Sequence, residues 1–282
     1  MMKVSVSGFY AWRKRLTQPP KLKRKPLAQL VRDCYFENRR RYGSRRIKEA
    51  LHKQGICIGR FKVRSLMKEQ ALKAIGPKRF VPRTTDSKGT CASPNLLKGI
   101  KVEECAPAKV IIGDITYIPL QDGSWCYLAM WQDKVTRRIV GWSLSHEMTA
   151  ELVVSALDKA IKKGLVLAGA IIHSDRGSQY ASTAFRALLR REGLRQSMSG
   201  RGNCYDNAQA ESFFSRFKTE LIEGGAFEDI EQARSEIFSY IEGYYNRVRL
   251  HSSLGYKSPM EFEAEWKIKN GGRKDSFLSI FT

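Results

Sequence analysis

The pattern of apolar residues from residue 110 onward constrains the fold most, because it changes there from helical to strand-like. Three runs are rich in β-branched and aromatic residues and are separated by short turns: 110–120, 125–133 and 138–145. Runs of this length and spacing predict three antiparallel strands joined by hairpins. An amphipathic helix is expected next, over 149–163, with Gly164 at its end.

Strands and helices alternate in the rest of this region. The expected elements are a strand over 167–174, a helix over 183–192, a strand over 194–198 and helices over 206–222 and 230–247. Five strands with helices between and after them predict an α/β domain, built on an open, mixed sheet with helices on its faces.

Positive charge is concentrated in the first third of the 282-residue chain. Residues 1–100 carry 26 Lys and Arg against 5 Asp and Glu, whereas residues 101–282 carry 24 against 23. A basic module for a polyanion, joined to a balanced globular domain, accounts for this asymmetry, because long-range attraction to phosphate raises affinity. A basic surface that serves only solubility is the alternative.

The basic region has helical periodicity between residues 27 and 75, which predicts about three helices. Ser44 is placed to cap the second helix and Gly55 to end it. On the third, basic residues recur every four positions and share one side: Arg60, Arg64 and Lys68. The pattern fits a helix-turn-helix-like DNA-binding domain, with the third helix in the major groove. We expect Arg45 and Arg46 to contact DNA too; a solvated charged face is the alternative for each residue.

Composition predicts five segments. They are a basic N-terminal segment (1–25), a helical DNA-binding domain (26–76), a linker (77–108), a globular α/β domain (109–265) and a C-terminal tail (266–282). The six cysteines include no Cys-x-x-Cys pair, which indicates unpaired thiols in a cytosolic chain. No apolar run approaches the roughly 18 residues of a membrane span. We therefore expect a cytoplasmic, nucleoid-associated protein without a membrane partner.

Three acids lie where strands or a helix would bring them to one site. Asp114 interrupts an apolar strand, Asp175 ends the fourth strand, and Glu211 lies on the helix over 206–222. An acid in an apolar row is costly without a partner, and the carboxyl ends of strands in open α/β sheets are usual ligand sites. We predict that the three hold divalent metal. Taken singly, each has another interpretation: a buried structural acid, a turn residue and an exposed helix acid, respectively.

Two further residues belong to this constellation. Lys218, seven residues after Glu211, returns to nearly the same side of an α-helix, where it could hold a substrate phosphate. Asn207, near the start of the helix over 206–222, is expected to cap it, with a contact to DNA as the alternative. Two Mg²⁺ ions, which Mn²⁺ could replace, would activate a hydroxyl nucleophile and stabilise the leaving oxygen in phosphoryl transfer on DNA.

Several motifs, in order along the chain, carry a resemblance to a known family. They are Tyr42-Gly-Ser-Arg-Arg-Ile47, Gly113-Asp-Ile-Thr-Tyr-Ile118, Arg138-Ile-Val-Gly-Trp142, His173-Ser-Asp-Arg-Gly-Ser-Gln-Tyr180, Gly202-Asn-Cys-Tyr-Asp-Asn-Ala208, Glu211-Ser-Phe-Phe214, Tyr245-Asn-Arg247 and His251-Ser-Ser-Leu254. The chain resembles the second-frame transposases of bacterial insertion sequences, members of the DDE transposase and retroviral integrase superfamily. The 35 residues between Asp175 and Glu211 are the spacing that marks this superfamily.

The resemblance implies an RNase H-like catalytic fold with Asp114, Asp175 and Glu211 as the metal-binding catalytic triad. It implies that water first attacks the element's end and that the freed 3′-hydroxyl then attacks a second phosphodiester, without a covalent protein–DNA intermediate. The DNA partners would be the terminal repeats and the target, held by a homodimer or larger assembly, with an upstream-frame protein as a possible partner.

Two other functions stay open at this point. A DNA-binding regulator without catalysis would retain the basic module, although all three acids are present. A nuclease of the same fold would cut without joining, and sequence does not separate these two reactions.

Overall fold

The chain divides into two compact units, Met1–Gly76 and Pro77–Thr282, named here the basic unit and the sheet unit. The computed structural model describes residues 5–16, 24–76, 93–100, 105–200, 208–223 and 225–270. No helix in these ranges is long and apolar enough to cross a membrane. The four cysteines within them, Cys34, Cys57, Cys105 and Cys126, are free thiols.

The basic unit contains α1 (Val6–Leu16) and three helices that pack together, α2 (Arg24–Glu37), α3 (Ser44–Lys53) and α4 (Arg60–Glu69). Their shared core is formed by buried side chains from all three: Val31, Tyr35, Ile47, Leu51, Val63, Leu66 and Met67. The three expected helices are therefore present, with α3 and α4 joined by a short turn in the manner of a helix-turn-helix.

The ends of α3 test two sequence predictions. Gly55, at φ +79°, follows the helix and confirms the expected stop, because glycine adopts this left-handed conformation without strain. Ser44 as a cap was wrong: Gly43 is the N-cap, in an extended conformation and without a side-chain cap, and Ser44 is the first helical residue.

The sheet unit is built on five strands in the order β3-β2-β1-β4-β5. They are β1 (Val110–Pro119), β2 (Trp125–Asp133), β3 (Ile139–Ser145), β4 (Ile171–Ser174) and β5 (Arg195–Met198). β1 pairs antiparallel with β2, as does β2 with β3, whereas β4 pairs in parallel with both β1 and β5. The predicted mixed five-stranded sheet is confirmed.

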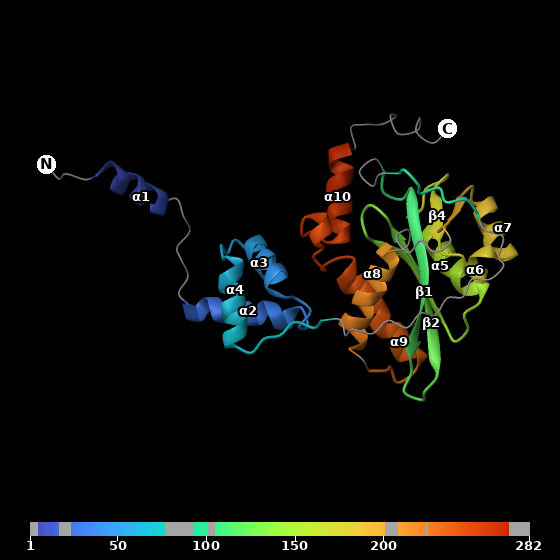
Figure 1. Ribbon diagram of the computed structural model, residues 1–282, viewed down its shortest axis with the longest axis horizontal. Coiled ribbons are helices and arrows are strands. Elements are labelled where there is room, and N and C mark those ends of the chain that lie inside the picture. Colours follow the sequence, from blue (N-terminus) through green and yellow to red (C-terminus); the bar gives the residue numbers. More distant parts are fainter. Residues whose placement is uncertain are drawn as a thin grey trace. The chain divides into compact units, whose positions relative to one another are not determined.

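Helices cover both faces of this sheet (Figure 1). On one face α8 (Ala208–Phe217) and α9 (Ile230–Phe238) bury an aromatic-rich cluster that includes Phe213, Phe214 and Phe217. On the other lie α5 (Ala150–Lys162), α6 (Ser178–Ala181) and α7 (Thr183–Arg191), which pack around Trp131. The two clusters sandwich the sheet, so the site residues on β1 and β4 stand on a rigid support.

The glutamate helix is interrupted. The sequence predicts one helix over 206–222, but α8 ends at Phe217 and the chain continues as a π-helical turn, η3 (Lys218–Ile222). A second π-helical turn, η4 (Ser239–Tyr245), follows α9 in the same way. The expected alignment of Lys218 with Glu211 assumed an uninterrupted α-helix, so it does not apply here.

A buried ion pair fixes η3. Arg249 Nη2 lies 2.7 Å from Glu220 Oε1, and the Tyr240 hydroxyl donates to Glu220 Oε2 at 2.9 Å. Both charged side chains are only 4% exposed. Removing one partner of such a pair is strongly destabilising, because the other charge stays buried alone.

One helix was not predicted from the sequence. α10 (Pro259–Asn270) begins after Ser258, which makes reciprocal bonds with Glu261: Ser258 N donates to the Glu261 carboxylate at 2.8 Å, and Glu261 N donates to Ser258 Oγ at 3.3 Å. This is a capping box with proline at the first helical position. A short 3₁₀ turn, η5 (Ser252–Leu254), precedes it.

Residues 93–100, which the sequence assigns to the linker, contact the edge of β5. Met198 N donates to Pro94 O at 3.3 Å, and Leu96 N donates to Ser197 Oγ at 2.9 Å.

The fourth strand is shorter than expected. Ala170 N donates to Leu167 O at 3.0 Å and Gly169 has φ +72°, so residues 167–170 form a turn before β4.

Candidate active site

Two of the three predicted acids stand at the same level on neighbouring strands. In the parallel pair β1·β4, Ile112 is opposite His173. Asp114 and Asp175 each follow two residues later, Asp114 within β1 and Asp175 directly after β4. Adjacent strands are about 4.8 Å apart and side chains alternate between faces, so the parallel register carries both carboxylates to one place.

The turn after β4 holds Asp175 in position. Gly177 N donates to Asp175 Oδ1 at 3.0 Å. A Cβ on Gly177 would lie 3.1 Å from that oxygen and 2.9 Å from Gln179 Oε1, so glycine allows the backbone to approach the carboxylate closely. Burial raises the pKa of Asp175, and the Gly177 N–H partly offsets this.

His173, two residues before Asp175, is a framework residue. Its ring is fully buried, with Nδ1 at 2.8 Å from Ser197 Oγ and Nε2 at 3.2 Å from Ser199 Oγ. Both serines come from β5 and the residue that follows it. These contacts connect the edge strand to β4 and give the histidine a structural role.

Tyr180, on α6, was not singled out as a site residue, although it belongs to a quoted motif. Its ring packs against Trp131 and Phe185, with centroid distances of 5.8 and 5.7 Å. The hydroxyl is buried and has no hydrogen-bond partner among the described residues. Burial raises the pKa of Tyr180, and the negative charges of Asp175 and Asp114 raise it further. Both acids therefore act on one buried hydroxyl.

Lys218, a predicted DNA contact, lies near enough to Asp114 to feel its charge. Burial lowers its pKa, whereas the nearby charge of Asp114 opposes the change. Its Nζ lies 3.7 Å from the centre of the Tyr117 ring, a distance at which a cation is attracted to the face of the ring. The first residue of η3 is thus next to the acid on β1.

Glu211 lies in the first turn of α8 and is exposed. Its neighbours Ala210, Phe213 and Phe214 are buried against the sheet, and Gln209 Nε2 donates to Asp133 O at 3.2 Å, which ties the start of α8 to the end of β2. Asn207 lies outside the described residues. Within the described ranges, no three His, Cys, Asp or Glu side chains form a group that could hold a metal ion.

The donor chemistry of Asp114 and Asp175 nevertheless suits magnesium. Mg²⁺ takes oxygen ligands and is commonly bound through one or two carboxylates, with water and substrate phosphates as the other ligands. Two neighbouring carboxylates beside an unpartnered buried hydroxyl fit this requirement.

Asp133 has a structural role. It is 2% exposed and accepts bonds from Val135 N, Thr136 N and Thr136 Oγ1 at 2.9, 2.7 and 3.0 Å. These donors close the turn between β2 and β3.

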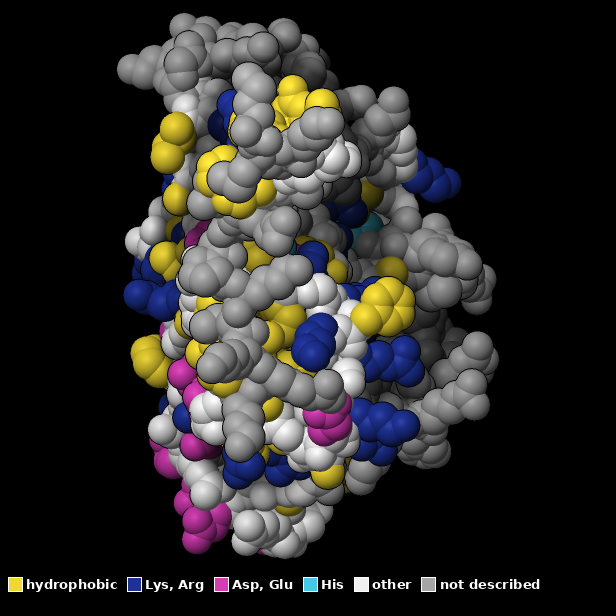
Figure 2. Space-filling model, turned by 90° about the vertical axis from the view of Figure 1, so that its left-hand side faces the viewer, with side chains coloured by type: hydrophobic (Ala, Val, Ile, Leu, Met, Phe, Trp, Pro, Cys, Tyr) yellow, Lys and Arg dark blue, Asp and Glu magenta, His cyan; other side chains and the backbone are white. Residues whose placement is uncertain are grey.

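The predicted DNA contacts of the basic unit differ in exposure. Arg45, Arg60, Arg64 and Lys68 are exposed. Arg46 is half-buried, with its guanidinium 5.5 Å from the centre of the Tyr42 ring. In Figure 2, dark blue Lys and Arg side chains gather in the lower right part of the visible face, with yellow hydrophobic side chains among them.

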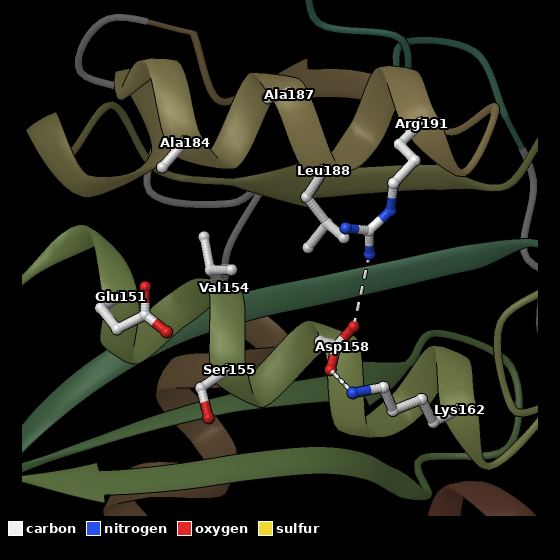
Figure 3. A pocket seen from close by; sticks show the side chains of 9 residues that line it. All are labelled: Glu151, Val154, Ser155, Asp158, Lys162, Ala184, Ala187, Leu188 and Arg191. Carbon is white, nitrogen blue, oxygen red and sulfur yellow. Dashed lines mark hydrogen bonds and ion pairs between the residues drawn. The ribbon is translucent and has the colours of Figure 1, made fainter.

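A groove of about 630 Å³ lies elsewhere, between α5 and α7 (Figure 3). Asp158 is paired there with Lys162 at 2.6 Å and with Arg191 at 3.5 Å, while Val154 and Leu188 face each other across the opening. None of the predicted site residues lines it. Asp158 in this groove already has its charge balanced by Lys162 and Arg191 and needs no ligand. The acids on β1 and after β4 therefore remain the candidate active site.

Two family models match overlapping parts of the sheet unit, and a third matches most of the basic unit. Residues 105–204 and 192–259 each match an integrase core domain, and residues 21–80 match an HTH-like domain. Among solved structures, a chain of the simian T-cell lymphotropic virus intasome is similar over 77% of this chain and 70% of its own, with 16% identity and a TM-score of 0.47. The catalytic core domain of BIV integrase is similar over 58% of this chain and 99% of its own, with 18% identity and a TM-score of 0.43.

Curated relatives match nearly end to end. The transposase of insertion sequence element IS904 from Lactococcus lactis is 42% identical over 86% of this chain and 95% of its own. Transposase InsF of insertion sequence IS3A from Escherichia coli is 37% identical over 93% and 91%, respectively. On this identity and coverage, the chain belongs to the family of insertion-sequence transposases, DDE-type polynucleotidyl transferases of DNA transposition with an HTH-like domain and an integrase core domain.

Proposed function

We propose that Asp114, Asp175 and Glu211 are the catalytic and metal-binding residues with which this transposase cuts and joins the ends of its own element. The observation that carries the proposal is the parallel register of β1 and β4, which puts Asp114 and Asp175 at the same level on neighbouring strands. Glu211 is the third member because α8 packs on the sheet face toward which Asp114 points.

Two Mg²⁺ ions are the proposed cofactor, with Mn²⁺ as a substitute; when bound, they would activate the nucleophile and stabilise the leaving oxygen. The chain's own residues position the DNA. Lys218, next to Asp114, holds a phosphate of the scissile strand by charge. The half-buried position of Asp175 reduces water around its carboxylate and so strengthens each electrostatic contact there.

The reaction has two steps in this proposal. A water oxygen attacks phosphorus at the element's end, the P–O3′ bond breaks, and the strand ends in a free 3′-hydroxyl. That hydroxyl then attacks a second phosphodiester, displacing another 3′-oxygen. The first step hydrolyses one phosphodiester bond and leaves a 5′-phosphate opposite the free 3′-hydroxyl, the second exchanges one phosphodiester bond for another, and neither needs a high-energy cofactor.

The basic unit supplies the remaining contacts in this proposal. Arg45, Arg60, Arg64 and Lys68 are exposed and would bind the terminal repeats; Arg46 and Asn207 complete the proposed set. Target DNA would bind at the sheet unit, in a homodimer or larger assembly that brings two ends together, with an upstream-frame protein as a further proposed partner.

A strand-transfer assay tests the proposal. Full-length protein is mixed with labelled element-end DNA and Mg²⁺ or Mn²⁺, and joined products are separated from shortened ones. We expect Asp114→Asn, Asp175→Asn and Glu211→Gln each to lower joining by about a hundredfold or more, with DNA binding changed by no more than a few-fold. Glu231→Gln, which removes an exposed acid on α9, is the matched control and should join normally.

The outcomes separate the functions. Undiminished joining by any one acid variant would remove that residue from the mechanism. Products that only shorten indicate a nuclease, and binding without any metal-dependent product indicates a regulator; either result contradicts the proposed reaction.

A further inference from the structure

Phe61 is a large apolar side chain exposed to water on the helix expected in the major groove. It is the second residue of α4 and is 84% exposed, the highest value among the large hydrophobic residues that the structure describes. A phenylalanine left in water forgoes about 2 kcal/mol of burial free energy. Such a residue contributes nothing to the core of the three-helix unit, so its position calls for another role.

The direction of Phe61 follows from the buried residues of α4. Val63, Leu66 and Met67 face the core. At about 100° per residue, Phe61 points within about 20° of the direction opposite to them. Phe61 therefore stands at the crest of α4, away from α2 and α3.

Cations lie along one side of this crest. Arg60, Arg64 and Lys68 are exposed on the same helix, and Lys68 points within about 20° of the direction of Phe61. Lysine and arginine bind phosphate oxygens and fix a helix on the duplex, whereas a phenyl ring makes no such bond. The arrangement suits the phosphate-flanked floor of a DNA groove better than an apolar protein surface.

The chemistry of the major groove supplies one apolar partner. Each base pair presents hydrogen-bonding groups there, but only thymine presents a methyl group, and phenylalanine is among the residues that contact it. In helix-turn-helix proteins the N-terminal residues of the second helix contact the base edges. Phe61 is in that place on α4.

We propose that Phe61 determines sequence specificity by packing against the 5-methyl group of a thymine in the terminal repeat. The proposal rests on DNA binding by the basic unit and not on the acids of the sheet unit. It assigns the base contact to Phe61 and the phosphate contacts to the exposed cations around it.

Replacing thymine by deoxyuridine tests this contact, because the two bases differ only by the methyl group. The full-length chain is titrated with duplexes of the element's end in which each thymine in turn is replaced. We expect wild type to lose about three- to tenfold in affinity at one position. Phe61→Ala should lose a similar factor on unmodified DNA and be indifferent to deoxyuridine at that same position.

Two controls accompany the scan. Phe238→Ala removes another exposed phenylalanine, 59% exposed on α9 of the sheet unit, and should leave the whole scan unchanged. Phe61→Leu retains an apolar side chain and should retain part of the methyl preference. Thermal unfolding checks that the variants are folded. Because both positions are exposed, we expect melting temperatures close to that of wild type.

The interpretation is overturned if, at every position, the affinity losses caused by Phe61→Ala and by deoxyuridine add, because additive losses mean that the ring and the methyl group act independently. It is equally overturned if Phe61→Ala binds all duplexes as wild type does. The same deoxyuridine scan on Glu211→Gln separates DNA binding from catalysis. If this variant shows the wild-type pattern of affinities but joins no DNA, the base contact is supported whatever the role of the acids.

Discussion

Asp175 is placed where its negative charge is disfavoured unless a cation joins it. Burial raises the pKa of its carboxyl, and Asp114 on the adjacent strand brings a second negative charge to the same hydroxyl of Tyr180. Like charges this close destabilise each other. A bound divalent ion would relieve both effects, so the folded chain should gain stability from metal.

We therefore predict that Mg²⁺ or Mn²⁺ raises the melting temperature of wild type but not of Asp175→Asn. At about a hundred times its dissociation constant, a ligand bound only by the folded state adds about 2.7 kcal/mol. Because the pKa of Asp175 is raised, protons compete with metal, and the stabilisation should shrink as pH falls through that raised value. Differential scanning fluorimetry across metal concentrations and pH measures both effects.

Asp122→Asn is the control for this prediction, since it removes an acid from the exposed turn between β1 and β2. It should respond to metal as wild type does. An equal rise in Asp175→Asn would mean that the stabilising metal binds elsewhere.

The candidate acids could be predicted from the sequence because each lies at a recognisable place in a strand or helix. Tyr180 could not be singled out in the same way. Its significance depends on the packing of α6 against Trp131, a contact between residues distant in sequence. Phe61 has no signal either, because an apolar residue in a helical pattern is normally assigned to the core.

At the level of the elements, β1 pairs with β2 opposite Trp131 only because Gly113 has no side chain, since the indole of Trp131 lies over that glycine. A Cβ there would lie 2.3 Å from Cζ3 of Trp131. The indole is fully buried, stacks on Phe185 at 5.7 Å and donates from Nε1 to Val153 O at 3.2 Å. Neither the ring nor the strand can move without disturbing the other, and Asp114 is the next residue on β1.

Gly113→Ala should accordingly destabilise the sheet unit by about 1–3 kcal/mol, the usual cost of overpacking a core, and lower strand transfer by displacing Asp114. Urea unfolding followed by tryptophan fluorescence gives the free energy. Gly243→Ala is the matched control, since a Cβ at that exposed position meets nothing within 4 Å. Equal stability of the two variants would show that β1 tolerates the added methyl group.

The strands and most helices were predictable because their apolar residues recur with a clear period. The π-helical turns were not predictable, because no local pattern marks their i to i+5 hydrogen bonds. In η3 the buried Glu220 pairs with Arg249, which lies far away in the chain. α10 was missed because its apolar residues mark no single face, although the Ser258–Glu261 capping box was present in the sequence.

For the whole molecule, the uneven charge predicts how DNA binding responds to salt. The first 100 residues hold almost all of the net charge of +22. Each phosphate contact releases counterions, so the slope of log K against log salt concentration reports the number of such contacts. Cations of the basic unit should set this slope.

Arg64→Gln or Lys68→Gln should each reduce the magnitude of the slope by about one and weaken binding to all sequences alike. Lys162→Gln should not change it, because that exposed lysine lies on α5 and pairs with Asp158. Fluorescence anisotropy over a range of salt concentrations gives the slopes. A slope unaffected by either basic-unit substitution contradicts a phosphate contact at that residue.

Residues 93–100 give the sheet a closed border along β5, so this strand offers fewer free backbone groups to a second copy. The same segment bonds Ser197, whose hydroxyl also holds His173. Residues 93–100 are thus joined through one serine to His173, two residues before Asp175. Support for the residue after β4 therefore includes a segment that precedes β1 in the chain.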